Sequence, residues 1–463
     1  MIDRDAVRAN AKYLRNVRPI DPDEVADYVE GQPHPAVVRR VLREEAYDLA
    51  LFERDDGTFV PADEDPVPPG WDPEGLPERY EDALADLLVE RWGIEWYDGP
   101  AGDHLRDVVS RLKADYYNQN PVEYDDDAAL GYAIYHLPDY YAAVGYVLDD
   151  LAERSLLPRR LRVLDVGAGV GGPAFGLHDY LPADSVVEYH AVEPSPAADV
   201  FSRLADETRR NFRPTVHDDR AETFDPDGEY DLVLLANVLS ELDDPEAVVD
   251  RYLESVAADG SLVALAPADR NTSIGLREVE RAVAPPGDDV TVYAPTLRLW
   301  PGESPSDVGW SFDERPDVDA PDVQRRLDDA GDGDGTFVNT SVKFSYFVAR
   351  TDGARRWDGR ADASRYAKMA EMDRHVTERV DVLAVKLSRN LAGDGNPLYK
   401  VGDGSESVEH YAVCTRESAL NRDLARADYG DVLAFENVLV LWNDDEEAYN
   451  LVVDGETVVD RVG

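Results

Sequence analysis

Cysteine, lysine and long apolar runs are all scarce in this chain of 463 residues. The single cysteine, Cys414, excludes an internal disulfide and a cysteine-based zinc or iron–sulfur cage. The eight histidines show no ligand spacing, so we expect no metal site. No stretch approaches the roughly 18 apolar residues of a membrane span, and no apolar signal region follows the charged N-terminus. We therefore expect a soluble, cytoplasmic protein with no membrane or disulfide partner.

Basic residues are also few. The chain has 47 Lys and Arg against 97 Asp and Glu, a net charge of −50, and only six of the basic residues are lysines. The acids are spread along the chain, and 43% of the residues are hydrophobic, which argues against disorder. The composition resembles that of haloarchaeal proteins, for which molar salt screens charge repulsion within about 3 Å. We interpret the acidity as a halophilic adaptation rather than as the mark of a partner.

The pattern of turns and apolar runs predicts several domains, as the length suggests. Asp21 followed by Pro22 is a typical helix start, and Asp55-Asp56-Gly57 is a hairpin turn between short strands. Short β-rich runs fill the last part of the chain, which is typical of a small barrel. The expected segments are a helical, winged-helix-like module and linker (1–77), a helical region packing on the core (78–155), an α/β domain with an insertion (156–350), a basic linker helix (351–379) and a C-terminal OB-like domain (380–463). Within the insertion, residues 315–335 are expected to form a solvated loop.

Strand, turn and helix patterns alternate from residue 161, which predicts a parallel α/β sheet. The first apolar strand ends in Gly167, Gly169 and Gly171, where missing Cβ atoms let the backbone approach a ligand at a helix N-terminus. No Lys-Ser/Thr pair follows, which excludes a P-loop. Asp165, two residues before the first glycine, stands where class I methyltransferases keep an acid facing the methionine ammonium of S-adenosylmethionine (SAM).

Three later positions extend this candidate cofactor site. Glu193 ends the second strand about 20 residues on, which suits ribose hydroxyls of either NAD or SAM. Asp218 or Asp219 would contact the adenine amine, and the sequence does not choose between them. Asn237 follows an apolar strand that matches the fourth methyltransferase strand, which favours SAM over NAD. The predicted fold class is α/β: a Rossmann-like, class I SAM-dependent methyltransferase domain with a winged-helix-like N-terminal region and a small C-terminal OB-like β-barrel.

Four motifs in a distinctive order resemble the ribosomal small-subunit methyltransferase-like family, of the Rsm-twenty-two type, which includes the mitochondrial methyltransferase-like protein seventeen. They are a Leu-Ser-Glu-Leu fourth strand at 239–242, a Pro-x-x-Tyr-Ala-Ala helix at 138–143, a Lys-Phe-Ser-Tyr strand at 343–346, and an Ala-Arg-x-x-x-Gly-Asp turn at 425–431. The resemblance covers about residues 130–435. It implies binding to the small ribosomal subunit and its rRNA, with roles in rRNA methylation, ribosome assembly or translation.

The chain departs from that family at the cysteines thought to hold an iron–sulfur cluster. Ala294, Trp300, Trp310 and Ser388 stand at those places. We therefore expect no iron–sulfur cluster, with the tryptophans filling the space as apolar packing.

A locally basic stretch is a candidate for RNA contact. Residues 349–379 carry eight basic and six acidic side chains, a local excess of +2 in a chain of net −50. Phosphate contacts from such a stretch, or the wet face of an ordinary amphipathic helix, explain it equally well. The candidate contacts are Arg355, Arg356, Arg360, Arg365 and Lys368.

The sequence identifies no catalytic residue beyond Asn237 as a weak candidate. Methyl transfer from SAM needs an aligned nucleophile more than an acid–base pair, and Cys414 lies far from the α/β domain, which disfavours cytosine C5 chemistry. Three functions remain open: an rRNA methyltransferase, a catalytically inactive SAM-binding assembly factor, and a small-molecule methyltransferase. The two appended modules disfavour the third.

Overall fold

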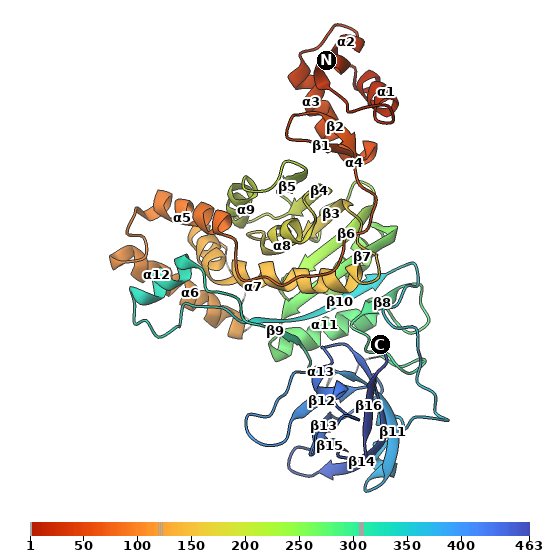
Figure 1. The fold of residues 1–463 in the computed structure, drawn as a ribbon. Coiled ribbons are helices and arrows are strands. Elements are labelled where there is room, and N and C mark those ends of the chain that lie inside the picture. Colours follow the sequence, from red (N-terminus) through yellow and green to blue (C-terminus); the bar gives the residue numbers. More distant parts are fainter. Residues whose placement is uncertain (1, 119, 121, 123, 305–309) are drawn as a thin grey trace. The chain divides into compact units, whose positions relative to one another are not determined.

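The computed structural model describes residues 2–118, 120, 122, 124–304 and 310–463 (Figure 1). The chain divides into two compact units, Met1–Leu234 with Val318–Thr340, and Leu235–Asp317 with Ser341–Gly463. In the part of the chain that the structure describes, no helix combines the length and the apolar character that crossing a bilayer requires.

The N-terminal module consists of helices followed by a hairpin, as predicted. Its elements are α1 (Arg4–Leu14), α2 (Pro22–Tyr28), α3 (Pro35–Glu44), α4 (Ala46–Leu49), β1 (Leu51–Glu53) and β2 (Phe59–Pro61). The predicted start of α2 is confirmed, because the Asp21 side chain accepts a hydrogen bond from the backbone N–H of Asp23 and Pro22 is the first helical residue.

Three helices, α5 (Glu78–Trp92), α6 (Gly99–Asn118) and α7 (Asp126–Ala152), follow the proline-rich linker. The Pro-x-x-Tyr-Ala-Ala motif at 138–143 lies within the single continuous helix α7, which runs through Pro138. α7 packs against α8 (Gly172–Tyr180). A Cβ on Gly176 would stand 2.3 Å from the carbonyl oxygen of Tyr141, so the two helices approach closely only because this residue is glycine.

The α/β domain is built on one mixed sheet. Its strands are β3 (Arg160–Val166), β4 (Val186–Val192), β5 (Phe212–His217), β6 (Tyr230–Ala236), β7 (Val256–Pro267), β8 (Thr291–Ala294) and β10 (Val342–Arg350), with β9 (Asp313–Arg315) paired to β10. The order is β5-β4-β3-β6-β7-β10-β8, and β10 runs antiparallel to both β7 and β8. Counted within the sheet this is 3-2-1-4-5-7-6 with an antiparallel seventh strand, the class I methyltransferase arrangement. The predicted fold class is confirmed.

Helices connect these strands. They are α8, α9 (Ala197–Ala205), η1 (Leu239–Glu241), α10 (Pro245–Leu253), α11 (Arg270–Val283) and α12 (Asp322–Asp329). The prediction of a solvated loop over 315–335 is wrong where α12 forms. Val323 and Leu327, four residues apart, are buried on one face of that helix, and the acidic background of the segment masked this short apolar stripe.

The predicted basic linker helix over 351–379 is also wrong. Most of this stretch has no regular structure, and only the short 3₁₀ segment η2 (Met369–His375) is helical. Asp352 accepts a hydrogen bond from the N–H of Ala354, and Asp362 accepts one from Ser364. These turns, together with Gly353 at a φ of 78°, compete with helix formation.

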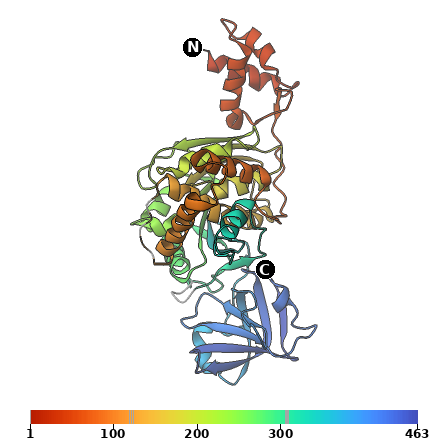
Figure 2. The same ribbon diagram turned by 90° about the vertical axis from the view of Figure 1, so that its left-hand side faces the viewer.

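The C-terminal region is a closed barrel, which confirms the OB-like prediction (Figure 2). Its elements are β11 (Arg379–Lys386), β12 (Leu398–Gly402), β13 (His410–Cys414), α13 (Asp423–Arg426), β14 (Val432–Asn443), β15 (Ala448–Val453) and β16 (Val458–Arg461). The order β11-β12-β13-β15-β14 closes through pairing of β14 with β11, and β13 runs parallel to β15. A short helix between the third and fourth strands completes the OB-like topology.

Candidate cofactor site

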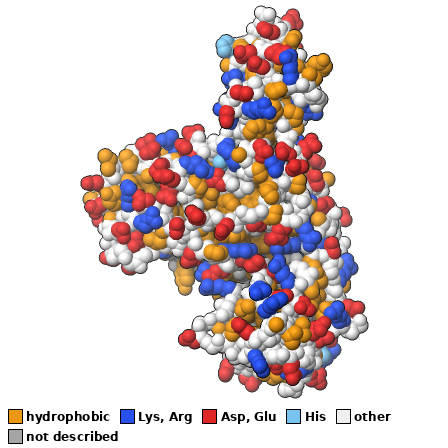
Figure 3. Space-filling view, viewed as in Figure 1, with side chains coloured by type: hydrophobic (Ala, Val, Ile, Leu, Met, Phe, Trp, Pro, Cys, Tyr) orange, Lys and Arg blue, Asp and Glu red, His pale blue; other side chains and the backbone are white. Residues whose placement is uncertain are grey.

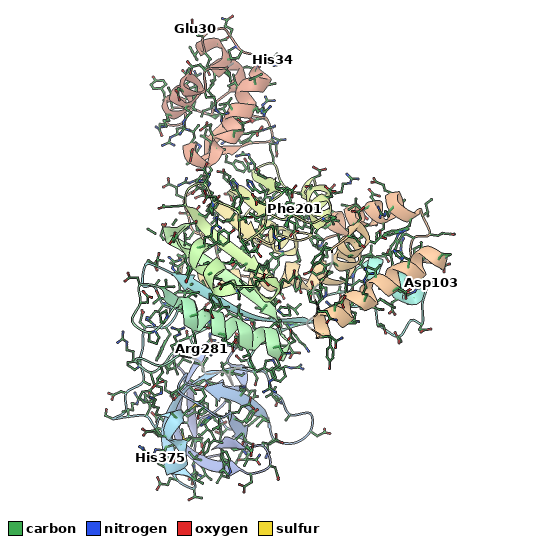
Figure 4. All side chains as sticks on the ribbon, turned by 180° about the vertical axis from the view of Figure 1, so that it is seen from behind. Glu30, His34, Asp103, Phe201, Arg281 and His375 are labelled. Carbon is green, nitrogen blue, oxygen red and sulfur yellow. The ribbon has the colours of Figure 1, made fainter. Side chains whose placement is uncertain are left out.

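The glycine-rich turn joins the central strand β3 to α8. Gly167, Gly169 and Gly171 have φ values of 74°, 54° and 93°, in the left-handed region that favours glycine. A Cβ on Gly171 would lie 2.6 Å from the ring of Phe201, which Figure 4 labels, so this glycine serves packing. A Cβ on Gly169 would meet nothing within 4 Å. The turn is therefore open at Gly169, at the N-terminal end of a helix.

Asp165 lies near the end of β3 and is completely buried. Its Oδ2 accepts a hydrogen bond of 2.6 Å from the hydroxyl of Tyr189, while its Oδ1 is buried without a partner among the described residues. Burial raises the pKa of Asp165 to about 7, Glu193 adds to that rise, and the Tyr189 hydroxyl opposes it. A buried carboxylate oxygen without a donor is costly, and a cationic donor would satisfy it.

Glu193 follows β4, the neighbour of β3. Its Oε2 accepts a 2.9 Å hydrogen bond from the N–H of Gly169, and its Oε1 accepts one of 2.9 Å from Ser195. The two strands run parallel with Val166 opposite Val192, so their carboxyl ends meet at one edge of the sheet. Strand order reverses at β3, which has β4 on one side and β6 on the other, and open α/β sheets bind ligands at such a point.

The two candidate adenine contacts differ in their surroundings. Both follow β5 and are exposed. Asp219 Oδ1 accepts hydrogen bonds from the Thr223 hydroxyl at 2.9 Å and from the N–H of Arg220 at 3.1 Å. Asp218 forms no hydrogen bond or ion pair with any residue that the structure describes.

Asn237 directly follows β6 and adopts a left-handed conformation with φ of 62°. Its N–H donates to the carbonyl oxygen of Leu265 at 2.9 Å. Asparagine tolerates this conformation better than most residues, and such strained positions cluster at functional sites. A catalytic role for its side chain stays a prediction.

Sequence reasoning missed Tyr189 and the pair of His190 and His217. Tyr189 lies on β4, one strand away from the carboxylate that it binds, and only the register of β3 with β4 reveals the contact. His190 Nδ1 lies 3.0 Å from His217 Nε2, with the rings stacked at 5.2 Å. Both histidines are half-buried and lie on adjacent parallel strands, so their contact follows from strand register and has no local sequence signal.

The candidate RNA contacts fall into two groups. Arg355 and Arg360 are exposed, and Arg356 is half-buried. Arg365 lies 3.2 Å from Glu436, and Lys368 forms an ion pair with Glu303, so both already have acidic partners.

The four positions at the family's cysteine places have different surroundings. Ala294 is buried in β8, and the indole N–H of the buried Trp300 donates to Asp403 at 2.6 Å. The hydroxyl of Ser388 accepts from the N–H of Lys400 at 2.7 Å. Trp310 does not fill a core as predicted, because 39% of it is exposed; the residues around it form an open cavity. The described residues contain no cluster of three or more His, Cys, Asp or Glu side chains suited to a metal.

Comparison with known proteins agrees with this architecture. The family described as "Methyltransferase domain" matches residues 164–262, and two families described as the N-terminal and C-terminal domains of a domain of unknown function (DUF8157) match residues 4–55 and 370–462. No curated protein matches the chain.

Solved methyltransferase structures show only a distant likeness to the chain. The plantazolicin methyltransferase BpumL in complex with SAH is 11% identical, with a TM-score of 0.29 over 59% of this chain and 97% of that chain. Magnesium protoporphyrin IX methyltransferase (ChlM) from Synechocystis PCC 6803, with bound SAM, is 13% identical, with a TM-score of 0.28 over 58% and 96%.

The strand order, the open glycine turn and the family match to residues 164–262 lead to the same conclusion. The chain contains a methyltransferase domain with the class I fold, and the open glycine turn marks its candidate cofactor site.

Proposed function

We propose that this chain transfers a methyl group from SAM to RNA of the small ribosomal subunit. The unpartnered Oδ1 of Asp165 carries the cofactor part of the proposal. The methionine end of SAM bears an ammonium group, which would supply the missing donor and charge to a buried carboxylate beside an open turn.

The other site residues fit the remaining parts of the cofactor. Glu193 is held against the turn by the N–H groups of Gly169 and Ser195, where its remaining lone pairs suit ribose hydroxyls. Asp218 suits the adenine amine better than Asp219 does, because the Asp219 carboxylate already accepts two local hydrogen bonds.

The bound cofactor supplies a methyl group that its sulfonium already activates. The protein then has to align the acceptor and exclude water. The side chain of Asn237, at the end of β6, is the candidate that orients a base amine. Cytosine C5 methylation is disfavoured, because Cys414 lies buried in β13 and burial raises the pKa of its thiol.

The domain organisation supports RNA as the substrate. The domain is flanked by a helical module with a hairpin and by an OB-like barrel, additions that a small substrate does not require. The ribosomal subunit itself rests on the resemblance of the four motifs. A SAM-binding assembly factor without catalysis, and a small-molecule methyltransferase, are the alternatives that the test below addresses.

The test maps small-subunit rRNA methylation in a deletion strain complemented with either the original chain or the Gly169→Asp variant. A Cβ at Gly169 would meet no protein atom within 4 Å, so the variant is expected to fold at a modest cost from its φ of 54°, with its carboxylate on the open side of the turn. The proposal expects one methylation to disappear in the deletion strain and to return only with the original chain. Methylation that persists with a folded variant unable to bind SAM contradicts catalysis, and unchanged rRNA in the deletion strain contradicts this substrate.

A further inference from the structure

A cavity of about 790 Å³ lies on one face of the OB-like barrel. Its walls come from β12, β13 and the loop between them, from the loop between β11 and β12, from the end of β14 and the loop that follows it, from residues 310–314, and from the start of α11. In OB-like barrels this combination of second and third strands with the loops that follow the first and fourth strands is the face that receives oligonucleotides and oligosaccharides. The cavity lies within one compact unit, and none of its lining residues belongs to the candidate cofactor site.

Two exposed tryptophans line the cavity in fixed orientations. Trp310 is 39% exposed and Trp442 is 37% exposed. The indole N–H of Trp310 donates to the carbonyl oxygen of Ala268 at 3.2 Å, and that of Trp442 donates to Asp444 at 2.9 Å. Because each ring is held by its polar edge, little side-chain freedom is lost when a flat ligand stacks on either ring.

Three cations line the same cavity. Arg270 forms no hydrogen bond or ion pair with the described residues, and Arg389 binds Glu314 through Nε at 2.5 Å while 63% of its side chain stays exposed. Lys400 binds the carbonyl oxygen of Trp310 at 2.9 Å and Glu409 at 2.7 Å. These cations and Glu314, Glu409, Glu446 and Glu447 give three positive against four negative groups, whereas the whole chain has 47 against 97.

We propose that this cavity binds an unpaired nucleotide of single-stranded RNA. Its base stacks on Trp442 or Trp310, and its phosphates contact Arg270 and Arg389. Stacking on aromatic rings beside a cationic track is how single strands are held without a sequence code. A free nucleotide has the same chemistry, and the experiment separates the two sources. The inference deepens the proposed function by naming an RNA-binding surface, but it does not depend on the cofactor site.

The experiment measures fluorescence anisotropy of a labelled ten-nucleotide oligoadenylate RNA with the full chain over a series of KCl concentrations. Trp442→Ala and Trp310→Ala are each expected to weaken binding about fivefold to a hundredfold. Leu441→Ala is the matched control, since Leu441 is the neighbouring residue on β14, is also 37% exposed, and does not line the cavity; its affinity is expected to stay unchanged. The double variant Arg270→Gln with Arg389→Gln is expected to lower the salt dependence of log K by about 1.4, at about 0.7 for each phosphate.

Absence of oligonucleotide binding, or Trp442→Ala and Trp310→Ala variants that bind like the original chain, would overturn the inference. So would adenosine monophosphate binding to the cavity as tightly as the oligonucleotide, because the site would then be one for a free nucleotide. SAM affinity, measured on the same preparations, separates the two proposals. If SAM does not bind but the tryptophan variants lose RNA as expected, the proposed function fails and this inference stands.

Discussion

At the residue scale, Asp165 is the most informative group in the molecule. It is fully buried, one of its oxygens has no described partner, and Tyr189 donates to the other. A carboxylate in these surroundings destabilises the folded chain unless a cation approaches it. The protein would thus accept a stability cost at this position in return for cofactor affinity.

The Asp165→Asn variant tests this interpretation. Asparagine keeps the shape and an acceptor for the Tyr189 hydroxyl, but it loses the charge that attracts the ammonium. We expect SAM affinity to fall about tenfold to a hundredfold, since a hydrogen bond to a charged group contributes about 1.5–3 kcal/mol. The free energy of unfolding at pH 8 should not decrease, because no buried charge remains. Calorimetry and chemical denaturation measure the two quantities, and a variant that binds SAM normally contradicts the assignment.

The raised pKa of Asp165 also predicts a pH dependence. Burial raises this pKa to about 7, well above the unfolded value of about 3.9. The folded state therefore holds a proton that the unfolded state has lost, and the contribution of Asp165 to stability decreases as the pH rises from about 4 to 7. A cationic ligand favours the ionised form, so SAM affinity should increase as the pH rises through about 7. Titrations at several pH values should show this increase in the original chain, and a similar increase in Asp165→Asn would assign it to another group.

At the scale of the element, the turn between β3 and α8 separates two roles of glycine. Gly171→Ala brings a Cβ to 2.6 Å from Phe201 at a φ of 93°, whereas Gly169→Ala adds a methyl group to open space at a φ of 54°. We expect Gly169→Ala to lower the free energy of unfolding by about 1–2 kcal/mol and Gly171→Ala by clearly more. Gly169→Ala should nevertheless weaken SAM binding. Thermal denaturation with SAM titration compares the two, and equal losses of stability would contradict this division of roles.

The parts of the fold that the sequence predicts correctly are those that depend on residues close together in the chain. The cap at Asp21, the glycine turn after Asp165 and the apolar strand before Asn237 each depend on neighbouring residues, and their elements were predicted correctly. The helix predicted over 351–379 does not form. The side chains of Asp352 and Asp362 stabilise turns in this stretch, and these turns outweigh the evenly spread arginines on which the prediction relied. The contact between Tyr189 and Asp165, and the exposure of Trp310, depend on strand register and on the barrel, which no local pattern encodes.

At the scale of the whole molecule, the net charge of −50 dominates the surface. Acidic side chains are distributed over the face shown in Figure 3 rather than gathered in one place. Repulsion among them destabilises the compact state at low ionic strength, and salt screens it. We expect the midpoint of thermal unfolding to rise between about 0.1 M and about 2 M KCl. Circular dichroism measures the midpoint, and a value that stays constant or falls contradicts a halophilic adaptation.

Cofactor binding by the intact chain tests the central claim most directly. Isothermal titration of SAM into the full chain in molar KCl, with circular dichroism to establish folding, measures whether the turn at Gly169 and the carboxylate of Asp165 form a binding site. The account predicts one SAM per chain, with affinity weakened in Asp165→Asn. A well-folded chain that takes up no SAM would contradict it.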